Sequence, residues 1–207
     1  MRRCRKRKIT THGRALRAAV GREKNMNALE IVKKAVLGHL SEGDFAIDAT
    51  AGRGYDTAFL ARTVGRTGRV LAFDIQKDAV ESTRALLASE GLDAEVLLAS
   101  HADMALYAAP ETASCILFNL GYLPGGDHSV YTRAESTVAA IRAGLEILKS
   151  GGIMCVTIYS GGANGYAERD ALIPFLATLD DKRFQVLALS FHNWKKDPPM
   201  PFFITKL

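Results

Sequence analysis

The chain has 207 residues, of which 48% are hydrophobic and 24% are charged, a composition typical of a single globular domain. No apolar stretch approaches the roughly 18 residues that cross a membrane. The three cysteines, Cys4, Cys115 and Cys155, are too few and too far apart for a disulfide framework, and no Cys/His spacing indicates a metal. We therefore expect a cytoplasmic protein with no bound metal, because free thiols persist in a reducing compartment.

The net charge of +5 is distributed unevenly along the chain. Residues 1–22 hold nine Arg or Lys and no acidic residue, so the remainder carries 18 basic against 22 acidic residues. We expect residues 1–22 to be a basic, poorly ordered leader and residues 23–207 to be a single domain. The leader lacks the apolar region of a secretory signal, but neutralisation of phosphates or an organelle transit peptide remain alternatives.

Apolar runs and helical periodicities alternate along the chain. The expected strands are 45–49, 69–74, 94–99, 115–120, 153–159, 184–191 and 202–206. The expected helices are 26–40, closed off by Gly43, then 57–64 and 79–90, one from a capping box at 132–135 to Gly151-Gly152, and one through 172–179. This alternation predicts an α/β fold with a mostly parallel sheet and helices on both faces. The last two strands have no helix between them and should form an antiparallel hairpin.

A glycine-rich turn follows the first expected strand, at Asp48-Ala-Thr-Ala-Gly52-Arg-Gly54. Glycines at this point let the backbone approach a nucleotide-like ligand without Cβ clashes, while Asp48 orients the turn or meets a ligand ammonium through water. Asp74 ends the second strand 20 residues after Gly54, where a carboxylate can accept both hydroxyls of a ribose. The pattern predicts an adenosine-containing cofactor in the first half of the chain.

Two cofactors fit such a turn, a nicotinamide dinucleotide and S-adenosylmethionine. The dinucleotide fingerprint requires a third glycine, and Thr57 occupies that position. An alternation that finishes in two antiparallel strands resembles the class I methyltransferases, whose opening motif is an acidic residue followed by a glycine-rich turn. The resemblance implies a Rossmann-like, seven-stranded sheet and S-adenosylmethionine as the cofactor.

A narrower resemblance rests on three motifs. The string Asn119-Leu-Gly-Tyr-Leu-Pro-Gly-Gly-Asp127, the string Asp48-Ala-Thr-x-Gly-x-Gly-x-Asp56-Thr57, and a late Asn193 followed by Pro198-Pro199 are similar to the YtqB/MnmM family. The similarity runs from about residue 26 to the C-terminus, and His128 departs from it where lysine is more usual.

This resemblance implies the substrate. It implies a tRNA methyltransferase that acts on the exocyclic amine of 5-aminomethyl-(2-thio)uridine at the wobble position, giving 5-methylaminomethyl-(2-thio)uridine. It also implies tRNA binding at the anticodon region, and a homodimer. The alternatives are an rRNA or small-molecule amine methyltransferase, and, in another class, an NAD-binding oxidoreductase or a non-catalytic nucleotide-binding module.

The Asn119 string also resembles the Asn-Pro-Pro-Tyr signature of amino-group methyltransferases. In methyl transfer to an amine, an amide oxygen that accepts the N–H bonds points the nitrogen lone pair at the methyl group, which predicts this catalytic role for Asn119. Tyr122 would hold the base by stacking, Asp127 would position the ammonium, and His128 is a second candidate for removing its proton. The alternatives are a strand followed by a Gly-Pro turn, with Tyr122 packing and Asp127 capping a helix.

Five further residues are candidate cofactor contacts. Ser100 and His101 follow the third strand, where this fold usually contacts adenine, although a lone loop histidine is more often structural. Gln76 lies two residues after Asp74 and either binds ribose or adenine or is an exposed helix start. By resemblance, Asn25 and Asn27 close over the methionine carboxylate, and helix capping is the alternative for both.

Two further features lie later in the chain. Residues 192–197 combine an aromatic ring with two cations in the expected hairpin turn, which suits a peripheral RNA contact, although charged turns are common on surfaces. Tyr159, at the end of the fifth expected strand, either lines the pocket or packs in the core.

Overall fold

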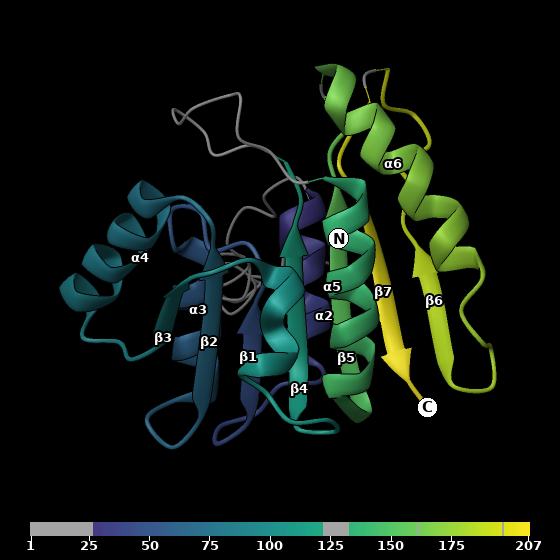
Figure 1. Cartoon of the computed structure of the whole chain (residues 1–207). Coiled ribbons are helices and arrows are strands. Elements are labelled where there is room, and N and C mark those ends of the chain that lie inside the picture. The colour runs from purple at the N-terminus through teal and green to yellow at the C-terminus, as the bar shows by residue number, and fades with distance from the viewer. Residues whose placement is uncertain (1–26, 122–132, 161, 196) are drawn as a thin grey trace, which may run out of the picture.

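The computed structural model describes residues 27–121, 133–160, 162–195 and 197–207, and these residues form one seven-stranded sheet. The strand order is β3-β2-β1-β4-β5-β7-β6 (Figure 1). The strands are β1 Phe45–Asp48, β2 Arg69–Asp74, β3 Glu95–Leu98, β4 Ala113–Asn119, β5 Leu148–Ile158, β6 Phe184–Ala188 and β7 Met200–Lys206. β1 to β5 pair in parallel, and β7 runs antiparallel to both β5 and β6, so the expected parallel sheet with a closing antiparallel hairpin is confirmed.

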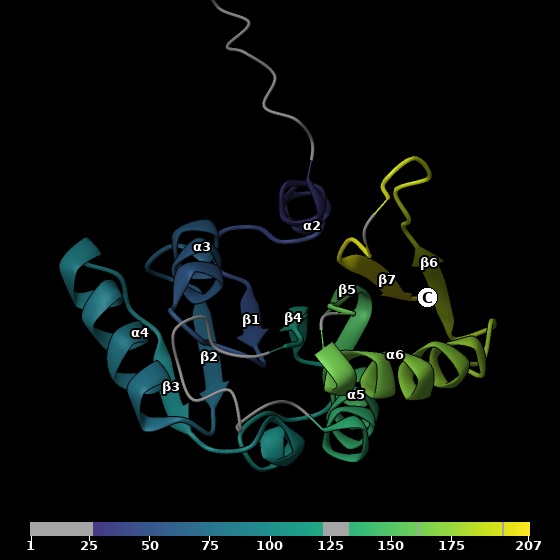
Figure 2. The same cartoon turned by 90° about the horizontal axis from the view of Figure 1, so that it is seen from above.

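Helices cover both faces of the sheet (Figure 2). They are α2 Ala28–Leu37, α3 Tyr55–Val64, α4 Lys77–Glu90, α5 Ala134–Ile147 and α6 Gly162–Ala177, with a 3₁₀ helix, η1 His101–Leu106. Successive strand residues point to opposite faces, so Ala46 packs with α2, α3 and α4 while Ile47 packs with α5, α6 and η1. None of the helices in the described ranges is long and apolar enough to cross a bilayer.

The junction between β1 and α3 depends on a buried carboxylate. Asp48 is 1% exposed; its Oδ1 accepts the Thr50 N–H at 3.1 Å and its Oδ2 accepts the Thr57 hydroxyl at 2.6 Å. Burial is the largest cause that raises the pKa of Asp48 to about 7. Asp48 therefore links the end of a strand to the first turn of the following helix across the glycine-rich turn.

Several expected boundaries are wrong. α2 ends at Leu37, because Gly38 is its C-cap, and β6 ends at Ala188. Arg133 is the N-cap of α5 and makes no side-chain cap bond, while Thr132 of the expected capping box lies outside the described residues.

Gly151 and Gly152 were expected to separate α5 from the fifth strand, but they lie inside β5. α5 ends at Ile147, and the register then shifts between the pairs Ala113↔Leu148 and Cys115↔Ile153. The glycines permit this irregularity, because Gly151 has a φ of 75° and a Cβ on Gly152 would lie 2.9 Å from the Lys149 carbonyl oxygen.

Gly54 is required by packing as well as by backbone geometry. It caps α3 with a φ of 85°, and a Cβ at this position would lie 2.8 Å from the Thr83 Cα in α4. We expect Gly54→Ala to lower the free energy of unfolding by about 3 kcal/mol, because strain and overlap add. Gly91→Ala is the control: its φ is 63° but nothing lies within 4 Å, so the loss should be about 1 kcal/mol. Equal losses in urea unfolding would show that the Thr83 contact imposes no constraint.

The raised pKa of Asp48 predicts a pH-dependent stability. The folded pKa of about 7 lies above the ordinary value of 3.8, so the contribution of Asp48 to stability is fully present below about pH 4 and is lost as the pH rises through 7. Relative to Asp48→Asn, which cannot ionise, the wild-type protein should lose up to about 4 kcal/mol of unfolding free energy between about pH 4 and pH 8. Parallel pH profiles for the two proteins in denaturant unfolding would contradict this.

Candidate active site

The glycine-rich turn is held by Asp74, the last residue of β2. Asp74 Oδ2 accepts the Gly52 N–H at 3.0 Å, and Oδ1 accepts the Gln76 N–H at 2.9 Å. The Ala51 N–H donates to the Phe73 carbonyl at 2.9 Å, so the turn lies across the end of β2. Each carboxylate oxygen has a second lone pair, which leaves Asp74 able to accept further hydrogen bonds from a ligand.

Three carboxylates surround this turn. After burial, the negative charge of Asp56 is the next cause that raises the pKa of Asp48, and the charge of Asp74 adds to it. Repulsion among like charges in a partly buried site favours a ligand that carries positive charge.

Asn119, the last residue of β4, joins the turn to the centre of the sheet. Its backbone N–H donates to the Thr50 hydroxyl at 2.8 Å, and its side-chain Nδ2 donates to Asp56 Oδ2 at 3.1 Å. The bond to Asp56 sets the orientation of the amide and leaves Oδ1 as the acceptor on the other side. Oδ1 is buried and has no hydrogen-bond partner among the described residues. A buried, unpaired carbonyl is costly, so this oxygen is suited to accept a hydrogen bond from a bound substrate.

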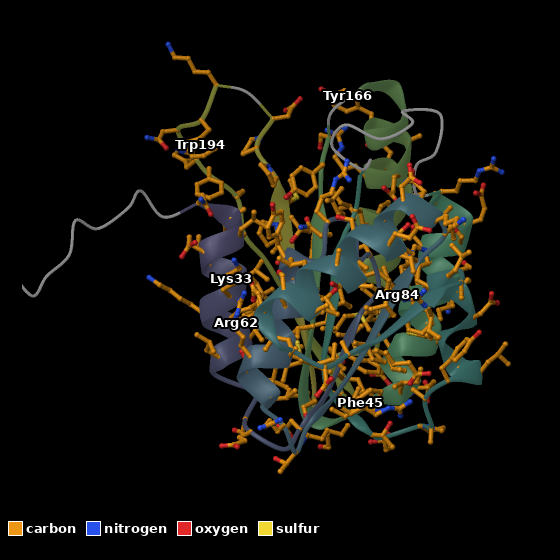
Figure 3. The ribbon with its side chains drawn as sticks, turned by 90° about the vertical axis from the view of Figure 1, so that its left-hand side faces the viewer. Lys33, Phe45, Arg62, Arg84, Tyr166 and Trp194 are labelled. Carbon is orange, nitrogen blue, oxygen red and sulfur yellow. The ribbon has the colours of Figure 1, made fainter. Side chains whose placement is uncertain are left out.

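A small cleft lies beside Asn119, between α2 and the carboxyl ends of β4 and β5. Its polar lining comes from Lys33, Asp56, Asn119 and Thr157, and its apolar lining includes Val32 and Leu117. Lys33 projects from α2 in Figure 3, and its ammonium lies 5.6 Å from the centre of the Phe59 ring. The cleft therefore has polar groups of both charges on apolar walls, as small-ligand sites commonly do.

Tyr159 follows β5 and contacts this site. Burial and then the charge of Asp56 raise the pKa of its hydroxyl, while a hydrogen bond from the Asn119 side chain opposes the shift. Tyr159 therefore belongs to the polar cluster around Asn119, and its lining of the pocket stays a prediction.

The residues expected at the adenine end have structural contacts in the fold. Ser100 is the N-cap of η1 and accepts the Ala102 N–H at 3.1 Å. His101 is 9% exposed, its Nδ1 lies 3.1 Å from the Ala49 carbonyl oxygen, and its ring packs edge-on against Phe118. Burial lowers the pKa of His101, which favours a neutral ring that donates to Ala49. These contacts connect the third strand to β1 and β4, and adenine binding by either residue stays a prediction.

Of the remaining predicted residues, two are helix N-caps and three lie outside the described residues. Gln76 is the N-cap of α4, is partly exposed and makes no side-chain cap bond. Asn27 is the N-cap of α2 and accepts the Glu30 N–H at 2.9 Å, so the capping alternative is confirmed for it. Asn25, Tyr122 and Asp127 lie outside the described residues, as do His128 and residues 1–22, the predicted leader.

Thr50, Asp56, Lys33 and Thr157 are site residues that the sequence analysis did not assign. Asp56 belongs to the Asp48–Thr57 motif, but its role depends on the contact with Asn119, 63 positions away. Its place two residues after Gly54 was the only local signal. No local sequence signal marks Lys33 or Thr157, because each reaches the cleft only through the packing of α2 and β5.

Metal and thiol chemistry find no support in the described parts of the chain. No group of three or more His, Cys, Asp or Glu side chains gathers there that could hold a metal ion. Cys115 and Cys155 are buried, and burial raises the pKa of Cys155 to about 12 and that of Cys115 well above its usual value. Neither thiol is therefore suited to act as a thiolate nucleophile.

Comparisons with known proteins agree with this geometry. The family model described as "Putative rRNA methylase" matches residues 70–205, and a model for protein-L-isoaspartate(D-aspartate) O-methyltransferase matches residues 18–112. A chloroplastic tRNA (mnm5s2U34)-methyltransferase of Arabidopsis thaliana is 36% identical over 167 residues. That match covers 75% of this chain and 60% of the relative, so the chain spans about three fifths of that relative's length.

Two solved structures are similar over their whole length. A protein named "putative rRNA-methylase" from Clostridium thermocellum is 39% identical with a TM-score of 0.86, covering 89% of this chain and 100% of the other. A protein named "putative methyltransferase" from Streptococcus mutans, solved in complex with SAH, is 32% identical with a TM-score of 0.81 and the same coverage. The chain therefore has the class I methyltransferase fold and belongs to the "Putative rRNA methylase" family, the resemblance that its Asn119 and Asp48 strings indicated.

Proposed function

We propose that this protein is an S-adenosylmethionine-dependent tRNA methyltransferase, which methylates the exocyclic amine of 5-aminomethyl-(2-thio)uridine at the wobble position to give 5-methylaminomethyl-(2-thio)uridine. The observation that carries the proposal is the buried Oδ1 of Asn119. This oxygen has no hydrogen-bond partner among the described residues and lies beside the acidic, glycine-rich turn. The name of the Arabidopsis relative supports the choice of tRNA as substrate.

The residues around the glycine-rich turn fit S-adenosylmethionine. Asp74 is positioned by Gly52 and Gln76 and has lone pairs for two ribose hydroxyls. Asp48, Asp56 and Asp74 provide the negative surroundings that a sulfonium and an ammonium favour. Gln76, Ser100, His101, Asn25 and Asn27 belong to the same proposal, at the adenine and methionine ends. When bound, the cofactor supplies an electrophilic methyl group on sulfur.

The acceptor amine would be oriented by Asn119. An N–H of the amine donates to Oδ1, and Asp56 prevents the amide from turning because it holds Nδ2. This leaves the nitrogen lone pair directed away from Asn119 and toward the methyl group, which lowers the orientational cost of an in-line displacement. By family resemblance, Tyr122 stacks on the base and Asp127 holds the ammonium before deprotonation. Recognition of the anticodon region, a homodimer and a cytoplasmic location complete the proposal.

The substrate is tested by supplying labelled cofactor together with bulk tRNA, rRNA or a metabolite extract. We expect label in tRNA only, and mass spectrometry of its nucleosides should show 5-methylaminomethyl-(2-thio)uridine. Label only in rRNA or in small molecules would refute the tRNA substrate. Calorimetry with S-adenosylhomocysteine and with NAD tests the cofactor, and binding of NAD alone would refute a methyltransferase.

Asp74→Ala should mainly weaken binding of the cofactor. The substitution removes the proposed ribose acceptor and also the two backbone contacts that shape the turn, so we expect the dissociation constant of S-adenosylhomocysteine to rise about a hundredfold. Asp78→Ala is the matched control, because Asp78 is an exposed carboxylate in the first turn of α4 and should leave the affinity unchanged. Calorimetry of both variants checks this, and equal affinities would remove Asp74 from the cofactor site.

Asn119→Ala should lower turnover while the cofactor still binds. Loss of the acceptor oxygen removes orientation of the amine, so we expect kcat to fall about a hundredfold with little change in S-adenosylhomocysteine affinity. Gln185→Ala, which removes an exposed carboxamide from β6, should leave both quantities unchanged. An unchanged kcat in Asn119→Ala would show that Asn119 does not orient the amine.

A further inference from the structure

An exposed aromatic stack lies on the segment that joins β6 to β7. The rings of Phe191 and Trp194 are 4.4 Å apart between centroids and lie at 23° to each other. Trp194 is nevertheless 50% exposed. Figure 3 shows Trp194 at the upper end of the molecule, at the same end as Tyr166. A half-exposed indole stacked on a second ring is preorganised to receive another flat ring.

A second cavity, of about 110 Å³, lies next to this stack. Its lining includes Phe191 together with the polar residues Ser160, Ser190, Arg169 and Asp197. An apolar ring beside hydroxyl, guanidinium and carboxylate groups provides both a stacking surface and partners for the polar edge of a ligand.

Contacts between α6 and this segment hold the cavity walls together. The Tyr166 hydroxyl donates to the Asp197 carboxylate, which ties α6 to the chain just before β7. The Arg169 guanidinium lies 4.9 Å from the centre of the Tyr166 ring and donates to Asp170 Oδ1 at 2.8 Å. The polar groups of the cavity are therefore positioned before any ligand arrives.

Both cavities lie at the carboxyl end of β5, at the same edge of the sheet. Thr157 lines the cleft of Asn119, and Ser160, three residues further along the same chain segment, lines the second cavity. Met200 lines the second cavity and pairs with Ile158 at the end of β5. Because both cavities lie at this edge, a polymer that brings one residue into the Asn119 cleft can bring a neighbouring residue to the stack.

We propose that the Phe191–Trp194 stack and its cavity bind an unpaired nucleobase of the RNA substrate, next to the nucleotide that enters the Asn119 cleft. Stacking on an exposed ring is the usual way in which proteins hold single-stranded bases, and it tolerates different sequences because every base has a π-face. The exposed cation of Lys195, beside Trp194, suits the adjoining phosphate. This inference rests on the proposed function in one respect, the use of RNA as substrate.

Trp194 is the only tryptophan of the 207 residues, so its fluorescence reports on this site alone. The wild-type protein, with S-adenosylhomocysteine bound, is titrated with a short RNA stem-loop and with a fully paired duplex of the same length. We expect the stem-loop to quench the fluorescence and the duplex to leave it nearly unchanged, because paired bases cannot stack on the indole.

Variants provide a second readout. Trp194→Ala should raise KM for the RNA about tenfold or more, with kcat and the affinity for S-adenosylhomocysteine unchanged, while Trp194→Phe, which keeps a ring, should recover most of the affinity. Leu187→Ala removes an exposed apolar side chain from β6 in the same hairpin and should change nothing. Thermal melting confirms that each variant is folded.

The outcomes separate this inference from the proposed function. Normal methylation of RNA with an unchanged KM in Trp194→Ala, or equal quenching by duplex and stem-loop, would overturn the base-binding site and leave the methyltransferase intact. Selective quenching by the stem-loop without methylation of any RNA would support the base-binding site and refute the proposed reaction. The absence of both quenching and methylation would refute the base-binding site and the proposed reaction together.

Discussion

The hydrogen bond from the Asn119 backbone N–H to the Thr50 hydroxyl, 2.8 Å long, joins the two halves of the site. Thr50 is placed by its own N–H bond to Asp48, and Asn119 is placed as the last residue of the central strand β4. Parallel strands bring their carboxyl ends to one edge, and this contact, together with the bond from the Asn119 Nδ2 to Asp56, couples the position of the turn to that of the amide. A transfer between a donor on the turn and an acceptor at Asn119 depends on that coupling, because small displacements of reacting atoms are costly.

The acidic character of the turn has an energetic cost in the protein itself. Asp48 is buried near Asp56 and Asp74, and its pKa of about 7 means that ionisation above that pH opposes folding. The hydroxyl of Thr57 offsets part of this cost by donating to Asp48. A site in which three carboxylates lie close together is suited to a cationic ligand, whose charge relieves their repulsion, and functional sites commonly carry such a cost.

The carboxyl edge of the sheet is divided between the proposed cofactor site and the proposed acceptor site. β1 and β2 end at the turn that fits the cofactor, whereas β4 and β5 end at the cleft lined by Asn119 and Thr157. β7 then runs back antiparallel to β5, so the segment before it, with Phe191 and Trp194, returns to the same edge. The antiparallel strand is therefore more than a closing element, because it brings an aromatic stack to the edge that carries the proposed acceptor site.

Local sequence was sufficient for the alternating strands and helices, the glycine-rich turn and the positions of Asp48, Asp74 and Asn119, because each follows from periodicity or from a residue type at a strand end. It was insufficient for Asp56, whose role comes from a contact with Asn119 across 63 positions. It was also insufficient for Gly151 and Gly152, which were expected to end a helix but lie at a register irregularity inside β5. The sequence by itself determined the fold and the chemistry of the turn. Only the tertiary structure decided which amide oxygen is left unpaired and which side chains surround it, because those depend on contacts between segments that no local pattern encodes.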